Sequence, residues 1–314
     1  MNFLFQMDDP KKIDINSDTT YLLIKEALKR KIHCYYTHAN SVHALINKNT
    51  NEIRSEVSKF YLNKDNSLNY ENPYLENLIN FKAIFVRQDP PYNMQYISNS
   101  YLLSELEKKL MVINSPLSLR NFPEKHIMMN FPDLTPPTII SLELNSIIEF
   151  IKKNKIVILK PAYGNGGIGI TKVSQSQKNL KGLITKYIKV FDSNPIVVQK
   201  FLPNYIKGDK RVILLGGTPI GAVLRVPAKN EIRSNFHAGG TAKKTNLTQR
   251  DKFICQSIKK FLLKNKLYFV GIDIIDGYLT EINITSPTGI HEINKMNNVK
   301  LEEKVMNYFL KKIN

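Results

Sequence analysis

The stretch from residue 271 to residue 287 constrains the fold more than any other part of this chain. It sets acidic and amide side chains among isoleucines on both sides of the pair Asp276-Gly277. β-Branched residues around an Asp-Gly pair predict two strands joined by a tight turn. Side chains alternate between the two faces of a strand, so the pairing register decides which residues share a face.

Two registers are open for this hairpin. A two-residue turn would place Glu281 and Asn283 on the face of the first-strand isoleucines, and both faces would be mixed. An odd loop, with Gly277 in the left-handed region and a bulge, would leave one apolar face and gather Asp273, Glu281 and Asn283 on the other. Facing carboxylates repel unless a cation or proton lies between them, and carboxylate and amide oxygens suit Mg²⁺ or Mn²⁺. The stretch alone is equally consistent with the solvent-facing side of an edge hairpin.

Composition narrows the class of protein. The chain has 314 residues, enough for two or three domains, and 42% of them are hydrophobic, as in globular proteins. No apolar run approaches the roughly 18 residues of a membrane helix, and the acidic start, with Asp8 and Asp9, is not a signal peptide. Only Cys34 and Cys255 are cysteines, which provides no disulfide framework and indicates a reducing, cytoplasmic location.

The net charge of +18 would suit a nucleic-acid-binding protein. The lysines, however, are spread over the whole chain, and the abundance of Asn, Ile and Lys indicates compositional bias. We therefore expect neither a nucleic-acid partner nor a membrane partner. The remaining charge favours a polyanionic ligand such as a nucleotide.

The first third of the chain predicts a parallel-sheet α/β domain. A helix capped by Ser17 or Asp18 lies between two strand patterns, which is a βαβ start. Arg87 follows a further buried strand, at the end where open α/β sheets bind ligands. No glycine-rich dinucleotide fingerprint follows the first strand. Predicted strands cover 2–7, 32–36, 83–86 and 111–113, a helix covers about 96–109, and 47–80 is expected to be a variable loop.

The middle of the chain contains a glycine-rich loop after the strand that ends at Lys160. Gly164, Gly166 and Gly167 allow backbone amides to approach and surround an anion. The loop lacks the Gly-Lys-Ser/Thr ending of a P-loop, and a plain hairpin turn is the alternative. A later stretch, 196–203, is predicted to be a strand that leads into a loop, which could present backbone groups to a nucleobase.

Two arginines are predicted on adjacent antiparallel strands, Arg211 and Arg225. Converging arginines are costly unless an anion accepts their donors, although both could be exposed. Residues 226–245 follow without periodicity, and we interpret them as a mobile lid, with a surface loop as the alternative. Thr248 predicts the cap of a helix that continues to Lys264, and a last helix covers 301–313.

These motifs, in this order, resemble the ATP-grasp superfamily and, within it, bacterial glutathione synthetase. The resemblance runs from about residue 3 to 295, and its most specific part is 279–288. It is carried by Met7-Asp8 with Pro10, 87–91, 114–120, 133–136, Lys125, 158–161 with the glycine loop, 208–211, Arg225 with the lid, and 270–275.

The resemblance implies a fold of mixed α/β and α+β class. A pre-ATP-grasp domain (1–121) would be followed by a central ATP-grasp lobe (122–200) and a C-terminal lobe (201–314) with the lid at 226–241. It implies a ligase that joins γ-glutamylcysteine and glycine through an acyl phosphate, using ATP and two Mg²⁺ or Mn²⁺ ions. It also implies a homotetramer.

The resemblance further implies roles for particular residues. Asp273, Glu281 and Asn283 would hold the metal ions, which requires the odd loop around Asp276-Gly277. Arg211 and Arg225 would stabilise the transferring phosphoryl group. ATP would contact Lys125, Lys160, Gly164, Gly166, Gly167, Gln199, Phe201, Leu202 and Asp209. The peptide and glycine would contact Asp18, Arg87, Arg233, Gly239, Gly240, Ser286 and Thr288.

The chain departs from the family pattern in two places. Thr241-Ala242 stands where an Arg-Gly pair is expected, and Gly289 and His291 stand where Cys and Arg are common. These departures bear on the lid and on acceptor selectivity. The nearest alternative is another ATP-grasp ligase, such as D-alanine–D-alanine ligase or an amino-acid–glutamate ligase. A nucleotide- or nucleic-acid-binding protein without ligase activity is the alternative from another class.

Overall fold

The N-terminal sheet is built around two central strands, β1 and β7, that are buried on both faces. In the computed structural model, which describes residues 1–313, its strand order is β3-β4-β2-β1-β7-β8. Strands β1, β2, β7 and β8 run parallel to one another, as predicted. Their bounds are Asn2–Met7 for β1, His33–His38 for β2, Ala83–Arg87 for β7 and Met111–Ile113 for β8.

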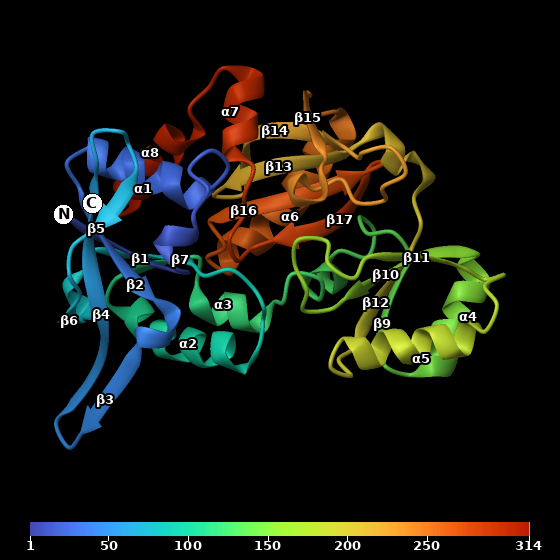
Figure 1. Ribbon diagram of the computed structural model, residues 1–314, viewed down its shortest axis with the longest axis horizontal. Helices are drawn as coiled ribbons and strands as arrows, with labels where there is room; N and C mark the ends of the chain where they lie inside the picture. Colours follow the sequence, from blue (N-terminus) through green and yellow to red (C-terminus); the bar gives the residue numbers. More distant parts are fainter. Residues whose placement is uncertain (314) are drawn as a thin grey trace.

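Two pairs of helices cover this sheet (Figure 1). Phe3, Phe5 and Phe85 pack with α1 (Thr19–Lys29) and the last helix, α8 (Leu301–Ile313). Leu4 and Ile84 alternate with them and pack with α2 (Met94–Ser104) and α3 (Pro116–Asn121). The alternation of apolar side chains along β1 therefore fills both layers.

The prediction of a variable loop at 47–80 is wrong. This segment contains most of a long antiparallel extension that projects from the parallel core (Figure 1). Ile53, Ser55 and Val57 are buried and alternate with Arg54 and Glu56 on β4, so one face of this part of the strand packs on the domain. The strands are β3 (His43–Asn47), β4 (Thr50–Leu62), β5 (Leu68–Tyr70) and β6 (Tyr74–Asn77).

The second sheet is antiparallel, in the order β11-β10-β12-β9. Helices α4 (Leu144–Asn154) and α5 (Leu180–Val190) cover one face, where Val157, Leu159 and Val198 form the core. Lys160 and Gln199 lie on the uncovered face, because they alternate with those residues. The strands are β9 (Thr138–Ser141), β10 (Ile156–Pro161), β11 (Thr171–Ser174) and β12 (Ile196–Lys200).

The third sheet is also antiparallel, in the order β15-β14-β13-β16-β17. Helix α6 (Gln249–Lys264) packs on one face through Ile254 and Ile258, and its cap at Thr248 is confirmed by a reciprocal bond with Asp251. The strands are β13 (Asp209–Leu215), β14 (Thr218–Val226), β15 (Thr241–Lys244), β16 (Phe269–Ile275) and β17 (Tyr278–Asn283), and α7 covers Ile290–Asn297.

The predicted domain boundaries, 121/122 and 200/201, fall in connections between the sheets and stay a prediction. Helix α8 belongs by sequence to the last third of the chain but packs on α1, where Arg30 donates to Asn307. Among the described residues, no helix is both long enough and apolar enough to span a membrane.

Candidate active site

A cavity of about 1040 Å³ lies where the three sheets meet, and its lining comes from all of them. Every predicted site residue lines it except Gly239 and Gly240. Gly240 instead closes the base of the lid, where an added Cβ would stand 2.0 Å from the Ser234 carbonyl oxygen. The structure therefore brings together residues that lie as far apart in sequence as Asp18 and Thr288.

The hairpin of β16 and β17 reaches the expected register by an unexpected route. The prediction of an odd loop is wrong, because Ile275 pairs with Tyr278 and leaves a two-residue turn in which Asp276 and Gly277 both have positive φ. The register then shifts by one residue at Thr280, so that Asp273 lies opposite Glu281. Because the bulge supplies the extra residue, the two carboxylates and Asn283 line the cavity together.

Four charged residues on β13, β14 and β16 form a buried cluster on the cavity wall. Arg211 donates from Nε and Nη2 to the two Asp273 oxygens at 2.6 and 3.0 Å. Arg225 Nη2 contacts Asp209 at 2.5 Å and Asp273 at 2.9 Å. Strand pairing explains the arrangement, since Arg211 lies opposite Asp273 and Asp209 lies opposite Arg225.

The ionisation of this cluster reflects burial and mutual attraction. Burial opposes the charge of Asp273, but the Arg211 and Arg225 guanidiniums outweigh it and lower the Asp273 pKa. Burial raises the pKa of Asp209 to about 6, against the opposing effect of Arg225. Arg225 Nε and Asp209 Oδ1 are buried without a hydrogen-bond partner among the described residues. These two atoms on the cavity wall are suited to groups of a polar ligand.

The predicted metal ligands fit a hard cation unequally. Four nitrogen atoms, from Arg211, Arg225 and Asn283, lie within 3.3 Å of the Asp273 oxygens, so its acceptor sites are filled. Glu281 is less occupied, with Lys125 Nζ 3.5 Å away and a quarter of its side chain exposed. Asn283 donates from Nδ2, which leaves its amide oxygen for a cation. Across residues 1–313 no three His, Cys, Asp or Glu side chains form a complete metal site. Protein oxygens of this kind suit Mg²⁺ that is also bound by substrate phosphates.

Two lysines and the glycine loop form the opposite wall. Lys125 Nζ bonds the Gly164 carbonyl and faces Glu281, which joins the linker, the loop and the hairpin. Lys160 Nζ donates to Gln199 at 3.0 Å, and burial lowers the Lys160 pKa. Gly166 and Gly167 have φ of +61° and +75°, a conformation that glycine adopts without strain. These groups offer cationic and N–H donors to an anion.

The predicted lid lies against the glycine loop. A Cβ on Gly167 would stand 2.6 Å from Asn235 Nδ2 in the lid, so the two segments are in close contact. Arg233 pairs with Glu231 at 2.6 Å, so its guanidinium is held within the lid. The lid also contains a short 3₁₀ helix, Phe236–Ala238, that the sequence did not predict. Phe201 and Leu202 line the cavity after β12, and Lys172 lies over the Phe201 ring at 4.1 Å.

The N-terminal domain contributes Asp18 and Arg87 to the cavity. Asp18 accepts from the Tyr21 N–H and caps α1, and His291 contacts the Asp18 carbonyl at 3.0 Å. Arg87 donates to Thr20 and to the Pro287 carbonyl, while its Nη1 is buried without a partner among the described residues. Burial lowers the Arg87 pKa. The two remaining predicted residues are hydrogen-bonded close to Arg87. Ser286 donates to the Gln88 carbonyl, and the Thr288 carbonyl accepts from Arg211.

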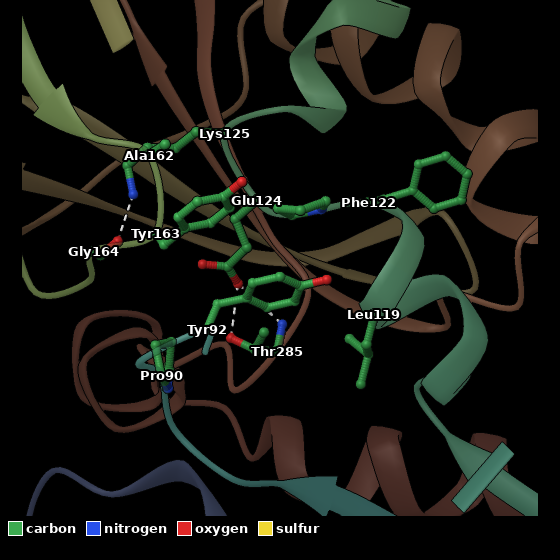
Figure 2. Close-up of a pocket in the computed structure, with 11 residues that line it drawn as sticks. Pro90, Tyr92, Leu119, Phe122, Glu124, Lys125, Ala162, Tyr163, Gly164 and Thr285 are labelled. Atoms are coloured by element: carbon green, nitrogen blue, oxygen red, sulfur yellow. Dashed lines mark hydrogen bonds between the residues drawn. The ribbon is translucent and has the colours of Figure 1, made fainter. Parts of the chain in front are cut away.

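Sequence reasoning missed Glu124, which lines the cavity beside Lys125. Figure 2 shows its carboxylate directed at Thr285, with which it forms two hydrogen bonds. Burial raises the Glu124 pKa, and the nearby Glu281 adds to this effect. Its position next to Lys125 is the only signal in the sequence, since a lone glutamate in a connecting segment shows no periodicity.

Comparisons with known proteins agree with this geometry. Residues 1–120 match the N-terminal domain, and residues 124–298 the ATP-grasp domain, of the prokaryotic glutathione synthetase family. A glutathione synthetase of Agrobacterium fabrum is 38% identical over 296 residues, covering 94% of this chain and 91% of the relative. One of Synechocystis is 36% identical and covers 98% of both chains.

Solved structures show the fold. A D-cycloserine synthetase matches with a TM-score of 0.69 and 10% identity, covering 99% of this chain and 100% of the other. D-alanyl-alanine synthetase A of Vibrio cholerae matches with a TM-score of 0.62 and 13% identity, covering 99% and 98%. With both of its domain models matched over nearly the whole length, the chain belongs to the prokaryotic glutathione synthetase family.

Proposed function

We propose that this chain joins γ-glutamylcysteine and glycine to form glutathione, with conversion of ATP to ADP and phosphate. The observation that supports this most is the shared cavity, in which the Arg211–Arg225 cluster faces Lys125, Lys160 and the glycine loop. Family membership supplies the substrates. Relatives named glutathione synthetase are 35–38% identical to this chain over more than nine tenths of it, whereas D-alanyl-alanine synthetase A is 13% identical.

Two steps account for the reaction. The cysteinyl carboxylate of the dipeptide attacks the γ-phosphate of ATP, which forms an acyl phosphate and releases ADP. The amine of glycine then attacks the acyl carbon, and phosphate leaves as the amide bond forms. In phosphoryl transfer a protein mainly positions the groups and stabilises charge.

The residues divide these tasks. Lys125, Lys160 and the backbone of Gly164 to Gly167 bind the phosphates, and Gln199, Phe201, Leu202 and Asp209 bind the nucleoside. Arg211 and Arg225 stabilise the transferring group and the tetrahedral intermediate, and losing one such donor typically costs roughly 10²–10³ in rate. The lid, with Arg233, excludes water from the acyl phosphate. Asp18, Arg87, Ser286 and Thr288 bind the dipeptide and glycine, whereas Gly239 and Gly240 shape the base of the lid outside the cavity lining.

Divalent cations complete the site. Glu281 and Asn283 would hold two Mg²⁺ or Mn²⁺ ions directly, and Asp273 would join them after releasing one of its arginine contacts. Such ions neutralise charge on the phosphates and orient them. We further propose that the protein acts in the cytoplasm as a homotetramer.

One assay tests the reaction class and the acceptor together. Phosphate release from ATP and Mg²⁺ is measured with γ-glutamylcysteine plus glycine, and in parallel with D-alanine alone. Release with the first pair, together with glutathione identified by mass spectrometry, is the expected result. Release with D-alanine alone would show instead that the chain is a D-alanine ligase.

A further inference from the structure

The five residues that follow β17 are held mainly by side chains from outside the C-terminal sheet. Residues 284–288 connect the metal-facing Asn283 to Ser286 and Thr288, which we assign to substrate binding. Its end is bound by Arg87 and Arg211, which donate to the carbonyls of Pro287 and Thr288. Its start is bound by two further side chains, Asn114 from the end of β8 and Glu124 from the linker that carries Lys125. Neither residue has a role in the reaction as proposed above.

Asn114 uses its whole amide in this contact. Its Nδ2 donates to the carbonyls of Phe269 and Ile284, both at 2.7 Å. Its Oδ1 accepts from the N–H groups of Tyr268 and Phe269 at 2.8 and 2.9 Å. Asn114 is 3% exposed, so these four bonds are shielded from water. The side chain therefore ties the start of β16 to the residue after β17.

Glu124 holds the same segment from the other side. Its Oε1 accepts three hydrogen bonds, from Ile284 N at 2.8 Å, Thr285 N at 3.0 Å and Thr285 Oγ1 at 2.8 Å. Figure 2 shows that the second carboxylate oxygen points away from Thr285. Among residues 1–313 this second oxygen accepts no hydrogen bond, so one oxygen alone makes the whole contact.

The two side chains meet on Ile284. Its N–H is bound by Glu124 and its carbonyl by Asn114, so the backbone on both sides of Ile284 has one preferred orientation. Ile284 itself is fully buried. The next residue in the linker, Lys125, contacts Gly164 in the glycine loop and Glu281 on β17. One short linker thus contacts the phosphate loop, the metal-facing strand and the acceptor segment.

We propose that Glu124 and Asn114 are positioning residues that hold residues 284–288 in the geometry needed to bind glycine. This inference rests on the proposed function, because it assigns Ser286 and Thr288 to the substrates. Glu124 acts through hydrogen-bond acceptance by Oε1 and not through its charge. The length of the side chain at position 124 and the placement of its acceptor oxygen therefore determine activity, and its negative charge does not.

Two substitutions of Glu124 separate the effect of side-chain length from the effect of charge. Glu124→Gln keeps the chain length and an acceptor oxygen but removes the charge, whereas Glu124→Asp keeps the charge and shortens the side chain. We expect Glu124→Gln to keep the KM for glycine close to the wild-type value. Glu124→Asp should raise the KM for glycine roughly 10- to 100-fold, the size expected when two ordinary hydrogen bonds are lost. Glu149→Gln, an exposed residue of α4, is the matched control for loss of a glutamate charge.

The readouts distinguish positioning from general loosening of the fold. The affinity for a fluorescent ADP analogue is measured with each variant and should stay within about twofold of wild type, because the phosphate-binding groups are untouched. Equal losses of glycine and nucleotide affinity would overturn the proposal, and so would a normal Glu124→Asp beside an impaired Glu124→Gln. Absence of glutathione with the wild-type chain would instead refute the proposed function.

Two further variants keep the test open if Glu124→Asp does not fold, and Thr285→Val is the milder of the two. Thr285→Val removes one of the three bonds to Oε1 and leaves both N–H bonds in place. It should raise the KM for glycine by less than Glu124→Asp does. Asn114→Asp removes the two donated bonds but keeps both accepted ones, and should act on glycine in the same direction. A KM for glycine unchanged in both variants would show that the segment needs no clamp.

Discussion

Asp273 and Glu281 lie opposite each other across one hairpin, yet the structure predicts opposite consequences for the same chemical change. Asp273→Asn and Glu281→Gln each replace a carboxylate by an amide of the same shape. Asp273 is 4% exposed and pairs with two arginines, whereas the Glu281 side chain is 25% exposed and pairs with one lysine. We expect Asp273→Asn to cost folding stability, and Glu281→Gln to cost activity without unfolding the protein.

The size of each effect follows from burial. Removing one partner from a buried ion pair costs about 3–5 kcal/mol, because the remaining charge is left uncompensated. Asp273→Asn leaves Arg211 without an ion-pair partner among the described residues, and Arg225 with Asp209 alone. The Glu281–Lys125 pair is longer, at 3.5 Å, and partly solvated, and pairs of that kind contribute about 0–1 kcal/mol. The two variants should therefore differ in the free energy of unfolding by about 2–5 kcal/mol.

Urea denaturation followed by circular dichroism measures the free energy of unfolding of each variant. Phosphate release with γ-glutamylcysteine and glycine measures the activity. Glu281→Gln should unfold close to the wild-type midpoint and show no turnover. Asp273→Asn should unfold at clearly lower urea. Equal midpoints for the two variants would refute the burial argument, and near-normal turnover of Glu281→Gln would remove Glu281 from the metal ligands.

Three further predictions concern the cavity wall. The Asp209 pKa is raised to about 6, above its unfolded value, so Asp209 stabilises the fold at low pH and this stabilisation is lost as pH rises through about 6. The urea midpoint of the wild-type protein should therefore fall between pH 4 and pH 7 by an amount that Asp209→Asn removes. Gly167→Ala should weaken ATP binding more than Gly166→Ala, measured by nucleotide titration, because only the Gly167 Cβ would meet the lid. Lys160→Met should abolish phosphate release with an unchanged fold, whereas Lys186→Met, on the exposed face of α5, should leave release at the wild-type rate.

The hairpin shows how far sequence reasoning reaches. Alternation left two registers open, and the resemblance to the family selected the one in which Asp273, Glu281 and Asn283 share a face, as they do in the structure. The same reasoning placed the extra residue in the turn, although Asp276-Gly277 is a strong two-residue signal. A bulge at Thr280 leaves no such signal, since threonine suits a regular strand equally well. Only the pairing partners on β16 reveal it.

Two other features lay outside what local patterns can show. Strand β4 contains many polar residues between its buried ones, and this composition is typical of a loop. It is a strand because its backbone pairs with β3, β5 and β6, which local sequence patterns do not show. Glu124 and Asn114 act on backbone groups more than 150 residues away, and backbone groups are identical in every sequence. By contrast, Arg211 and Arg225 were placed correctly on neighbouring strands, because the pattern of a hairpin around Gly216-Gly217 determines the pairing.

The charge balance of the Arg211–Arg225 cluster would couple nucleotide binding to metal binding. With two arginines and two aspartates the cluster is balanced, and the Asp273 oxygens have no acceptor site left. If Asp273 is to bind a cation, an arginine contact must be released, and that buried guanidinium then needs another anion. The phosphates of ATP are the anion that the lysines and the glycine loop of the opposite wall are suited to bind. A cation on Asp273 and a nucleotide would therefore favour each other's binding through the same two arginines.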